Sequence, residues 1–213
     1  MKYRLIENDT IIFRGRTLYR IQCVTPFANV NAGEKGGYIE KEGNLSQEGN
    51  AWVCENAWVC ENAWVSENAW VCENAWVSGN AKVSGNAWVS GNAKVSGNAK
   101  VSGNAWVSGN AKVSGNAWVS GDVWVGGDVC VCGNAKVKSS RDYMVFKNYW
   151  SSGRYFTYTR SDRMWKVGCF HGTGEKLIKK AYNDSEDSGK HYEAFVRFAE
   201  RLEEMDVEKN DIG

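Results

Sequence analysis

Residues 80–101, NAKVSGNAWVSGNAKVSGNAKV, repeat one six-residue unit, V-S-G-N-A-x, without interruption. Val occupies every sixth position from Val53 to Val137, fifteen times in all. Ala stands two places before each Val, replaced only by Val123 and Val129, and Asn or Asp stands one place before that residue. Repetition with a short fixed period is the sequence signature of a solenoid, so this stretch decides the fold.

Each unit combines a short strand with a turn. In the A-x-V triplet, Ala and Val point to one face and x to the other, because side chains alternate along a strand. The S-G-N triplet is typical of turns, since Gly adopts positive φ freely and Asn tolerates the left-handed region. Such short strands can pair only with the coils above and below. Three six-residue units per coil predict a triangular, single-stranded parallel β-helix, with Val and Ala inside and Asn side chains hydrogen-bonded along its axis.

The pattern [LIV]-G-x-N-[STAV]-x resembles the hexapeptide repeat of left-handed parallel β-helix proteins, over about residues 27–138. The left hand is implied by this resemblance alone, because the general rule for parallel crossovers favours a right-handed coil. The segment FANVNAGEKGGYIEKEGNLSQEGNAWV, Phe27 to Val53, also resembles the lead-in of hexapeptide-repeat proteins of bacteria and their phages. The resemblance implies a mainly β fold and does not by itself imply an activity.

The x positions decide what the outside of the solenoid displays. With three units per coil they form three columns, one of which is Trp throughout: Trp52, Trp70, Trp88, Trp106 and Trp124. The second column is Trp58, Trp76, Lys94, Lys112 and Cys130, and the third is Trp64, Lys82, Lys100, Trp118 and Lys136. A flattened coil of two units would instead mix Trp and Lys in both of its columns.

We take the all-Trp column as the candidate binding site, and name it the Trp stripe. Left bare, it would exceed the apolar patch that a monomer usually exposes, so something is expected to cover it. Three coverings are open at this point: the terminal segments of the chain itself, a second copy in a homo-oligomer, or a ligand or protein partner.

The sequence on either side of the repeat predicts three regions: a β cap over residues 1–36, the β-helix over residues 37–138 and an α+β module over residues 139–213. The runs KYRLI, TIIFRG and TLYRIQCV are typical of short antiparallel strands that cover an open coil end. In the module, DYMVFKNYW and RYFTYTRSDRMWKVGCF predict two or three strands.

Two helices are predicted after these strands. Thr173 can cap a helix that runs through Lys176 to Tyr182, and a second helix is expected after Gly189. Its apolar side at helical spacing is Tyr192, Phe195, Val196, Ala199 and Leu202. For the aromatic residues of the module, core packing is favoured over a binding face: Trp150, Tyr155, Phe156, Tyr158 and Trp165.

Histidine is the residue that argues against catalysis. The acyltransferases and carbonic anhydrases of the resembled superfamily need it as a base or a zinc ligand, and only His171 and His191 occur here, both outside the repeat. Cys169 adjoins His171, but neighbours in sequence seldom align as nucleophile and base. The remaining cysteines of interest lie on different coils and do not form a zinc set: Cys54, Cys72, Cys130 and Cys132. We therefore predict no catalytic residue, no metal and no cofactor.

Composition and charge indicate which partners and which cellular location to expect for the chain. Lys and Arg number 26 against 25 Asp and Glu, so net charge gives no indication of nucleic acid binding. No apolar run is long enough to span a membrane, and the charged start lacks a signal-peptide core. We expect a cytoplasmic protein whose seven cysteines are mostly reduced. Within the repeat, acidic residues replace Gly in the early coils, at Glu55, Glu61, Glu67 and Glu73, which favours solubility and discourages end-to-end stacking.

Three functions remain open. The leading hypothesis is a non-catalytic binding protein that presents its aromatic stripe to a macromolecular partner, with a phage-encoded host-manipulation or anti-defence role as one version. The first alternative is a self-assembling structural β-solenoid. The second is a hexapeptide-type transferase that uses CoA or a nucleotide.

Overall fold

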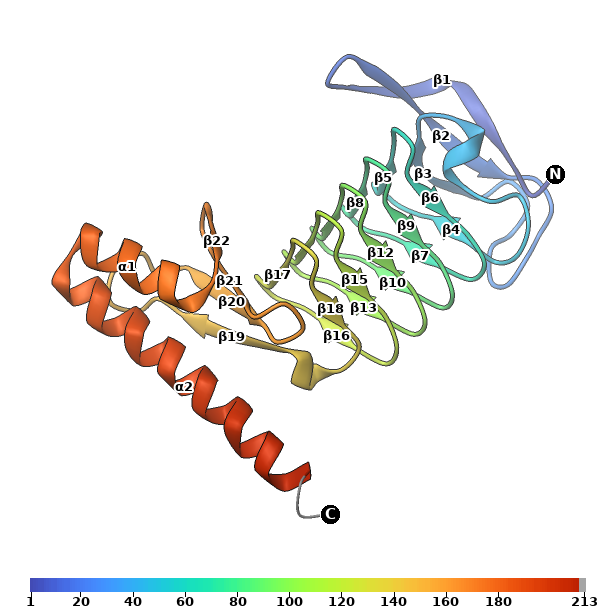
Figure 1. The fold of residues 1–213 in the computed structure, drawn as a ribbon. Helices are drawn as coiled ribbons and strands as arrows, with labels where there is room; N and C mark the ends of the chain where they lie inside the picture. Colours follow the sequence, from blue (N-terminus) through green and yellow to red (C-terminus); the bar gives the residue numbers. More distant parts are fainter. Residues whose placement is uncertain (211–213) are drawn as a thin grey trace. The chain divides into compact units, whose positions relative to one another are not determined.

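A computed structural model describes residues 1–210 of the 213-residue chain. The chain divides into two compact units, residues 1–140 and residues 141–213. The first contains the N-terminal strands and the solenoid, and the second contains a small sheet with two helices (Figure 1).

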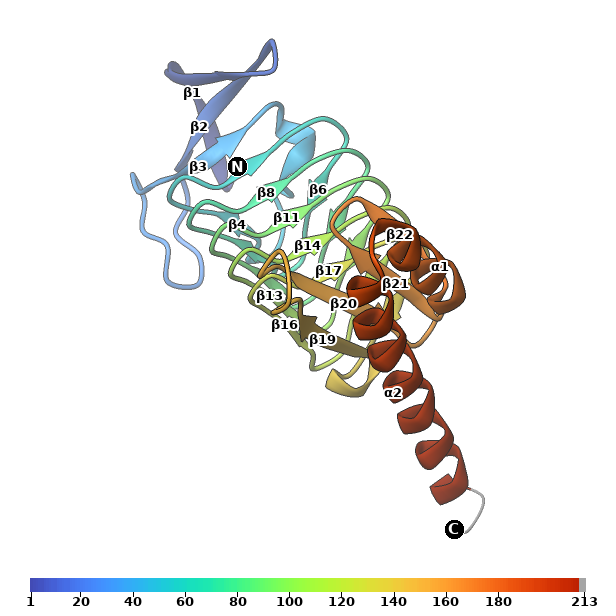
Figure 2. The same cartoon turned by 90° about the vertical axis from the view of Figure 1, so that its left-hand side faces the viewer.

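The solenoid is built from fifteen two-residue strands that pair in parallel with the strands one coil away. Strand and partner are always eighteen residues apart, as in Trp88↔Trp106, which confirms the predicted coil of three units. One sheet has the order β16-β13-β10-β7-β4, a second has β18-β15-β12-β9-β6, and the third continues from the N-terminal strands through β5-β8-β11-β14-β17 (Figure 2). The strands are β4 (Trp52–Val53), β5 (Trp58–Val59), β6 (Trp64–Val65), β7 (Trp70–Val71), β8 (Trp76–Val77), β9 (Lys82–Val83), β10 (Trp88–Val89), β11 (Lys94–Val95), β12 (Lys100–Val101), β13 (Trp106–Val107), β14 (Lys112–Val113), β15 (Trp118–Val119), β16 (Trp124–Val125), β17 (Cys130–Val131) and β18 (Lys136–Val137).

The interior is made of the Val and Ala columns, as predicted, and every member is buried. Each strand is one residue shorter than the A-x-V triplet, because the Ala amide bonds within the turn: Ala57 N donates to the oxygen of Cys54. The turns bring successive coils very close together at glycine. A Cβ built on Gly91, where φ is +67°, would lie 2.8 Å from the Gly109 nitrogen.

Four glutamates occupy this left-handed glycine position, at φ values of 55° to 63°. Two of their carboxylates accept an amide from the next coil: Glu61 Oε2 from Gly79 N at 2.7 Å, and Glu67 Oε2 from Gly85 N at 2.6 Å. These charge-assisted bonds offset the backbone strain of a side chain at positive φ. The early coils therefore carry acidic corners without losing the close contact between turns.

Asparagine ladders run along the corners, as predicted. In most rungs Nδ2 donates to Oδ1 of the residue one coil later, for example from Asn80 to Asn98 at 2.9 Å. Two ladders end in aspartate: Asn104 donates to Asp122 at 2.6 Å and Asn110 donates to Asp128 at 3.0 Å. The last rung of a ladder needs only an acceptor, so a carboxylate suits that position.

The N-terminal strands β1 (Tyr3–Phe13), β2 (Arg16–Cys23) and β3 (Lys35–Ile39) cover the first end of the solenoid and confirm the predicted cap. Strand β3 pairs in parallel with β5, so it continues the third sheet upward. The cap donates to the carbonyls of the first coil: Tyr38 N to Ala57 O at 2.9 Å, and Lys2 Nζ to Ala51 O at 2.8 Å. Burial lowers the pKa of Lys2 to about 8. A short 3₁₀ helix, Glu42–Asn44, leads into the first coil.

The second unit, preceded by a 3₁₀ turn at Ser140–Asp142, has a four-stranded antiparallel meander and two helices. Its strands are β19 (Tyr143–Lys147), β20 (Tyr155–Thr159), β21 (Met164–Val167) and β22 (Phe170–Gly172), and its helices are α1 (Gly174–Asp184) and α2 (Glu186–Asn210). Helix α2 begins at Glu186, so the prediction that this helix begins after Gly189 is wrong. A Cβ on Gly189 would clash with the ring of Tyr182, so this glycine allows the two helices to pack closely.

The core of the second unit is aromatic. Phe156, Tyr158 and Trp165 are buried, and Trp150 packs against them with its ring 4.5 Å from that of His191. Core packing is thus confirmed for these four residues, whereas Tyr155 is 45% exposed. No helix in the described part of the chain is both long and apolar enough to cross a bilayer.

Candidate functional site

The Trp stripe lies on one face of the solenoid, on strands β4, β7, β10, β13 and β16, as the coil period predicted. Its members pair in register, from Trp52↔Trp70 to Trp106↔Trp124. The rings of Trp70 and Trp88 are stacked, with centroids 5.7 Å apart and planes 10° apart. The later rings are tilted, with centroid distances of 6.5 Å and 6.1 Å. Because the rings lie against each other, the face presents mainly their hydrocarbon edges.

Exposure along the stripe is graded from the first coil to the last. Trp52 is fully buried, and the rings of Tyr3 and Phe27 lie edge-on to it at 6.4 Å and 5.5 Å. Trp70 is half-buried, and the exposed fraction then rises to 42% at Trp88, 50% at Trp106 and 64% at Trp124. The N-terminal segment of the chain therefore covers Trp52. The rest of residues 1–140 leaves the rings of Trp88, Trp106 and Trp124 partly exposed.

The indole N–H groups of the last two stripe residues bond to serine in the preceding coil. Trp106 Nε1 donates to Ser90 Oγ at 3.5 Å and Trp124 Nε1 to Ser108 Oγ at 2.8 Å. The serine of the turn is thus the acceptor for the Trp of the next coil, a role that the sequence pattern did not reveal to us. In the first two coils cysteine replaces this serine, and the structure joins Cys54 to Cys72 in a disulfide with Cα atoms 4.7 Å apart. Two of the seven cysteines form this bond, which agrees with the expectation of mostly reduced thiols, and stacking by one coil brings these two together.

The other Trp residues behave differently. Trp58 and Trp76 are half-buried beneath the β1–β2 hairpin, and the Phe13 ring lies 4.9 Å and 4.8 Å from theirs. On the third column Trp64 and Trp118 are about as exposed as Trp88, but their column neighbours are lysines. Only the stripe is an uninterrupted apolar column.

The strands and turn triplets of the stripe carry charge of one sign, although the cap places Lys2 and Arg20 against the carbonyls of Glu48 and Glu55 at its first end. The x positions of its five strands hold no charged residue, and the turn triplets that flank these strands hold acidic residues and no Lys or Arg. The acidic residues are Glu48, Glu55, Glu67, Glu73, Asp122 and Asp128. We name this set the acidic rim. A partner that matches it carries apolar groups at its centre and basic groups at its edge.

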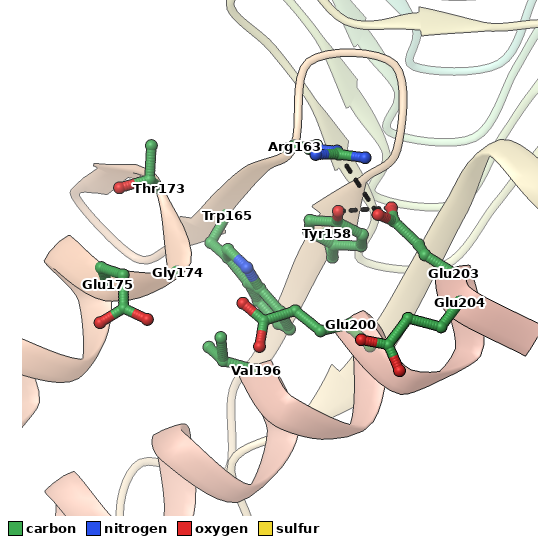
Figure 3. Close-up of a pocket in the computed structure, with 11 residues that line it drawn as sticks. Tyr158, Arg163, Trp165, Thr173, Gly174, Glu175, Val196, Glu200, Glu203 and Glu204 are labelled. Carbon is green, nitrogen blue, oxygen red and sulfur yellow. Dashed lines mark hydrogen bonds and ion pairs between the residues drawn. The ribbon is translucent and has the colours of Figure 1, made fainter.

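A cavity of about 630 Å³ lies within the second unit (Figure 3). Tyr158 and Trp165 form part of its wall, and Tyr158 Oη donates to Glu203 Oε1 at 2.6 Å. Burial and this carboxylate raise the pKa of Tyr158 above its ordinary range. Arg163 Nε lies 3.5 Å from Glu203 Oε2, so the cavity also contains an ion pair. Sequence reasoning missed this cavity, because its other glutamates on α2 have the spacing of an ordinary solvent-exposed face: Glu200 and Glu204.

The residues with catalytic or metal-binding chemistry are not gathered. Cys169 and His171 are both exposed. Over residues 1–206, whose side chains the structure describes, no three His, Cys, Asp or Glu side chains are placed to hold a metal ion.

Comparison with known proteins bears on the repeat. Residues 93–109 and 111–127 match a family model described as the YdcK beta solenoid repeat. No curated protein matches the chain significantly. Each matched segment is one residue short of a coil and contains three strands, β11 to β13 in the first and β14 to β16 in the second. The match and the fold agree that the chain is a β-solenoid repeat protein.

Proposed function

We propose that this chain is a non-catalytic binding protein whose Trp stripe is the contact surface for a protein partner. The observation that carries the proposal is the uninterrupted ladder from Trp70 to Trp124, with three rings 42% to 64% exposed on one face of a rigid solenoid. Tryptophan is enriched at the centres of protein interfaces, where it removes a large apolar area from water.

The rigidity of the face supports binding. Each stripe strand pairs with its neighbours in both directions along the axis, except at the two ends. The indole N–H groups of Trp106 and Trp124 are bonded to serines of their own chain. A partner therefore meets a preorganised apolar ridge and need not supply hydrogen-bond acceptors to those two rings, which lowers the entropy that association costs.

The acidic rim favours a different protein over a second copy of this chain. If two copies paired through the stripe about a two-fold axis, the rim of one would face the rim of the other, because a two-fold interface uses the same patch twice. Carboxylates of the turn triplets occur at both ends of the face, at Glu55 and at Asp128, so either relative direction brings carboxylates of the two copies together. A partner with Lys or Arg around an apolar centre avoids this repulsion.

The version in which the partner belongs to a host defence system rests on the resemblance of residues 27–53 to phage-borne proteins. A left-handed coil of the hexapeptide type rests on the same resemblance. Geometry supports neither beyond the β-solenoid itself.

The test compares two substitutions in the same repeat context. Trp88 and Trp118 are 42% and 41% exposed, and Lys already occupies the same position in other coils, so Trp88→Lys and Trp118→Lys should both fold. Trp118 even donates to Ser102 at 3.1 Å, so its replacement is the more demanding control for the fold. We expect Trp88→Lys to lower capture of the partner from host lysate by roughly 10-fold or more, and Trp118→Lys to leave it near wild type.

Two results would favour the alternatives. Filaments of the purified chain in sedimentation would favour the self-assembling solenoid, which the uniform stack of coils also allows. A tightly held CoA or nucleotide in native mass spectrometry would favour the transferase. Equal capture by both variants would contradict the proposal.

A further inference from the structure

A second cavity, of about 360 Å³, lies in the first unit where the β1–β2 hairpin reaches the third sheet. The side chains that line it include Arg14 from the hairpin turn and Trp76, Ser78, Lys94 and Ser96 from two successive coils of the solenoid. It is separate from the Trp stripe, which lies on another sheet. The hairpin is the segment labelled β1 and β2 at the first end of the solenoid in Figures 1 and 2.

Two cations converge on one ring in this cavity. The guanidinium of Arg14 lies 5.2 Å from the centroid of Trp76, and Lys94 Nζ lies 5.5 Å from it. Among the residues that the structure describes, neither side chain forms an ion pair. One carboxylate belongs to the lining, Glu61, and it already accepts the Gly79 amide at 2.7 Å and faces Arg16 at 3.9 Å. The cavity therefore holds two cations against one carboxylate, and that carboxylate already faces Arg16.

Ser78 supplies a hydroxyl that forms no hydrogen bond within the described chain. The residue as a whole is 7% exposed. The cause is visible in the repeat. Elsewhere the turn serine accepts the indole N–H of the next coil, as Ser90 does from Trp106. Above Ser78 the next coil has Lys94 in place of Trp, so the hydroxyl remains available to the cavity.

The backbone conformation at Arg14 is a separate observation that favours a role for this side chain. Arg14 and Gly15 are the two loop residues of the hairpin, with φ values of 48° and 77°, the combination of a type I′ turn. Asn, Asp or Gly suits the first of these positions, and a long side chain there is strained. The chain nevertheless places an arginine there, and the arginine lies over Trp76.

We propose that this cavity binds the phosphate group of a small organic phosphate. Arg14 and Lys94 would hold the charge, with the planar guanidinium contacting two oxygens, and the hydroxyls of Ser78 and Ser96 would donate to others. Two cations with two hydroxyls match a tetrahedral oxyanion better than a planar carboxylate. The volume is near the lower limit of small-molecule pockets, and Trp76 offers an apolar wall to the organic part.

The test titrates the full chain with inorganic phosphate, phenyl phosphate and benzoate at low salt, by calorimetry. We expect phenyl phosphate to bind at one site per chain, inorganic phosphate more weakly, and benzoate at least 10-fold more weakly than phenyl phosphate, about what one charge-assisted hydrogen bond is worth. Binding by inorganic phosphate equal to that of phenyl phosphate would mean that the free ion alone is recognised and would overturn the organic part of the proposal.

Variants decide which residues bind. Arg14→Asn and Lys94→Gln should each weaken phenyl phosphate binding by about 10-fold or more, and Ser78→Ala by several-fold. Arg14→Asn gives the turn its favoured Asn-Gly pair, so loss of fold is not expected there. Lys100→Gln, on another sheet, is the control and should bind as wild type. Absence of binding at about 10 mM phenyl phosphate, or equal affinity in Arg14→Asn, Lys94→Gln and Lys100→Gln, would overturn the proposal.

Discussion

Asn104 donates its side-chain amide to Asp122 at 2.6 Å, and Asp122 is the last rung of that ladder. Rungs before it both accept and donate, as Asn86 does when it accepts from Asn68 at 3.1 Å and donates to Asn104 at 2.9 Å. Asp can therefore replace Asn at position 122, because the last residue of the ladder accepts a hydrogen bond and does not need to donate one.

The first prediction depends on the donor-to-acceptor direction of this ladder. Asn104→Asp should lower the free energy of unfolding by about 1–2 kcal/mol, because it removes a donor and sets two carboxylates one coil apart. Asp122→Asn keeps an acceptor for Asn104 and should change the free energy of unfolding by less than about 0.5 kcal/mol. Urea unfolding of the full chain measures both. Equal losses would show that the direction of the ladder does not matter.

The second prediction concerns the contact between turns. Gly91 and Gly127 have nearly the same φ, +67° and +66°, but a Cβ on Gly91 would meet Gly109 at 2.8 Å whereas one on Gly127 would meet nothing within 4 Å. Gly127→Ala should cost about 1 kcal/mol from backbone strain alone. Gly91→Ala should cost about 1 kcal/mol more, because the next turn must shift slightly to admit the Cβ and Ala lacks the carboxylate that bonds the next turn at Glu61 and Glu67. Thermal unfolding of the two variants compares them directly. A difference near zero would contradict the close stacking of turns.

The third prediction concerns Lys2, whose pKa is lowered to about 8 from 10.5 by burial. Because the folded-state value is the lower one, the unfolded chain binds more protons between about pH 8 and pH 10.5, and the stability contributed at Lys2 rises with pH across that window. Lys2→Met should flatten this rise. Burial raises the pKa of the neighbouring Cys23 thiol, which acts in the opposite direction, so the informative quantity is the difference between wild type and Lys2→Met. A difference that is constant with pH would contradict the assignment.

Much of this architecture could be predicted from the sequence, because a six-residue period constrains every coil in the same way. The period alone predicted that Trp70, Trp88 and Trp106 lie in one column and that Val107 lies in the core. The left hand of the coil stays a prediction, since it came from resemblance and not from the period.

What could not be predicted depends on contacts between distant segments. Trp52 has the same local sequence as Trp58, yet Tyr3 and Phe27 bury it completely. The cavity that brings Arg14 to Lys94 arises only when the hairpin packs on the solenoid. Gly189 was expected just before a helix, and its use as a packing site inside α2 depends on the position of Tyr182.

The central claim is that the Trp stripe is the surface that contacts a protein partner. Photo-crosslinking from single sites tests it most directly, with a benzophenone side chain in place of Trp106, which is 50% exposed, or of Trp118, which is 41% exposed on another sheet. The account predicts adducts from position 106 and not from position 118, with partner peptides that carry Lys or Arg next to the crosslink and with yields that fall when Trp88→Lys is added. Adducts of equal yield from both positions, or none from position 106, would contradict it.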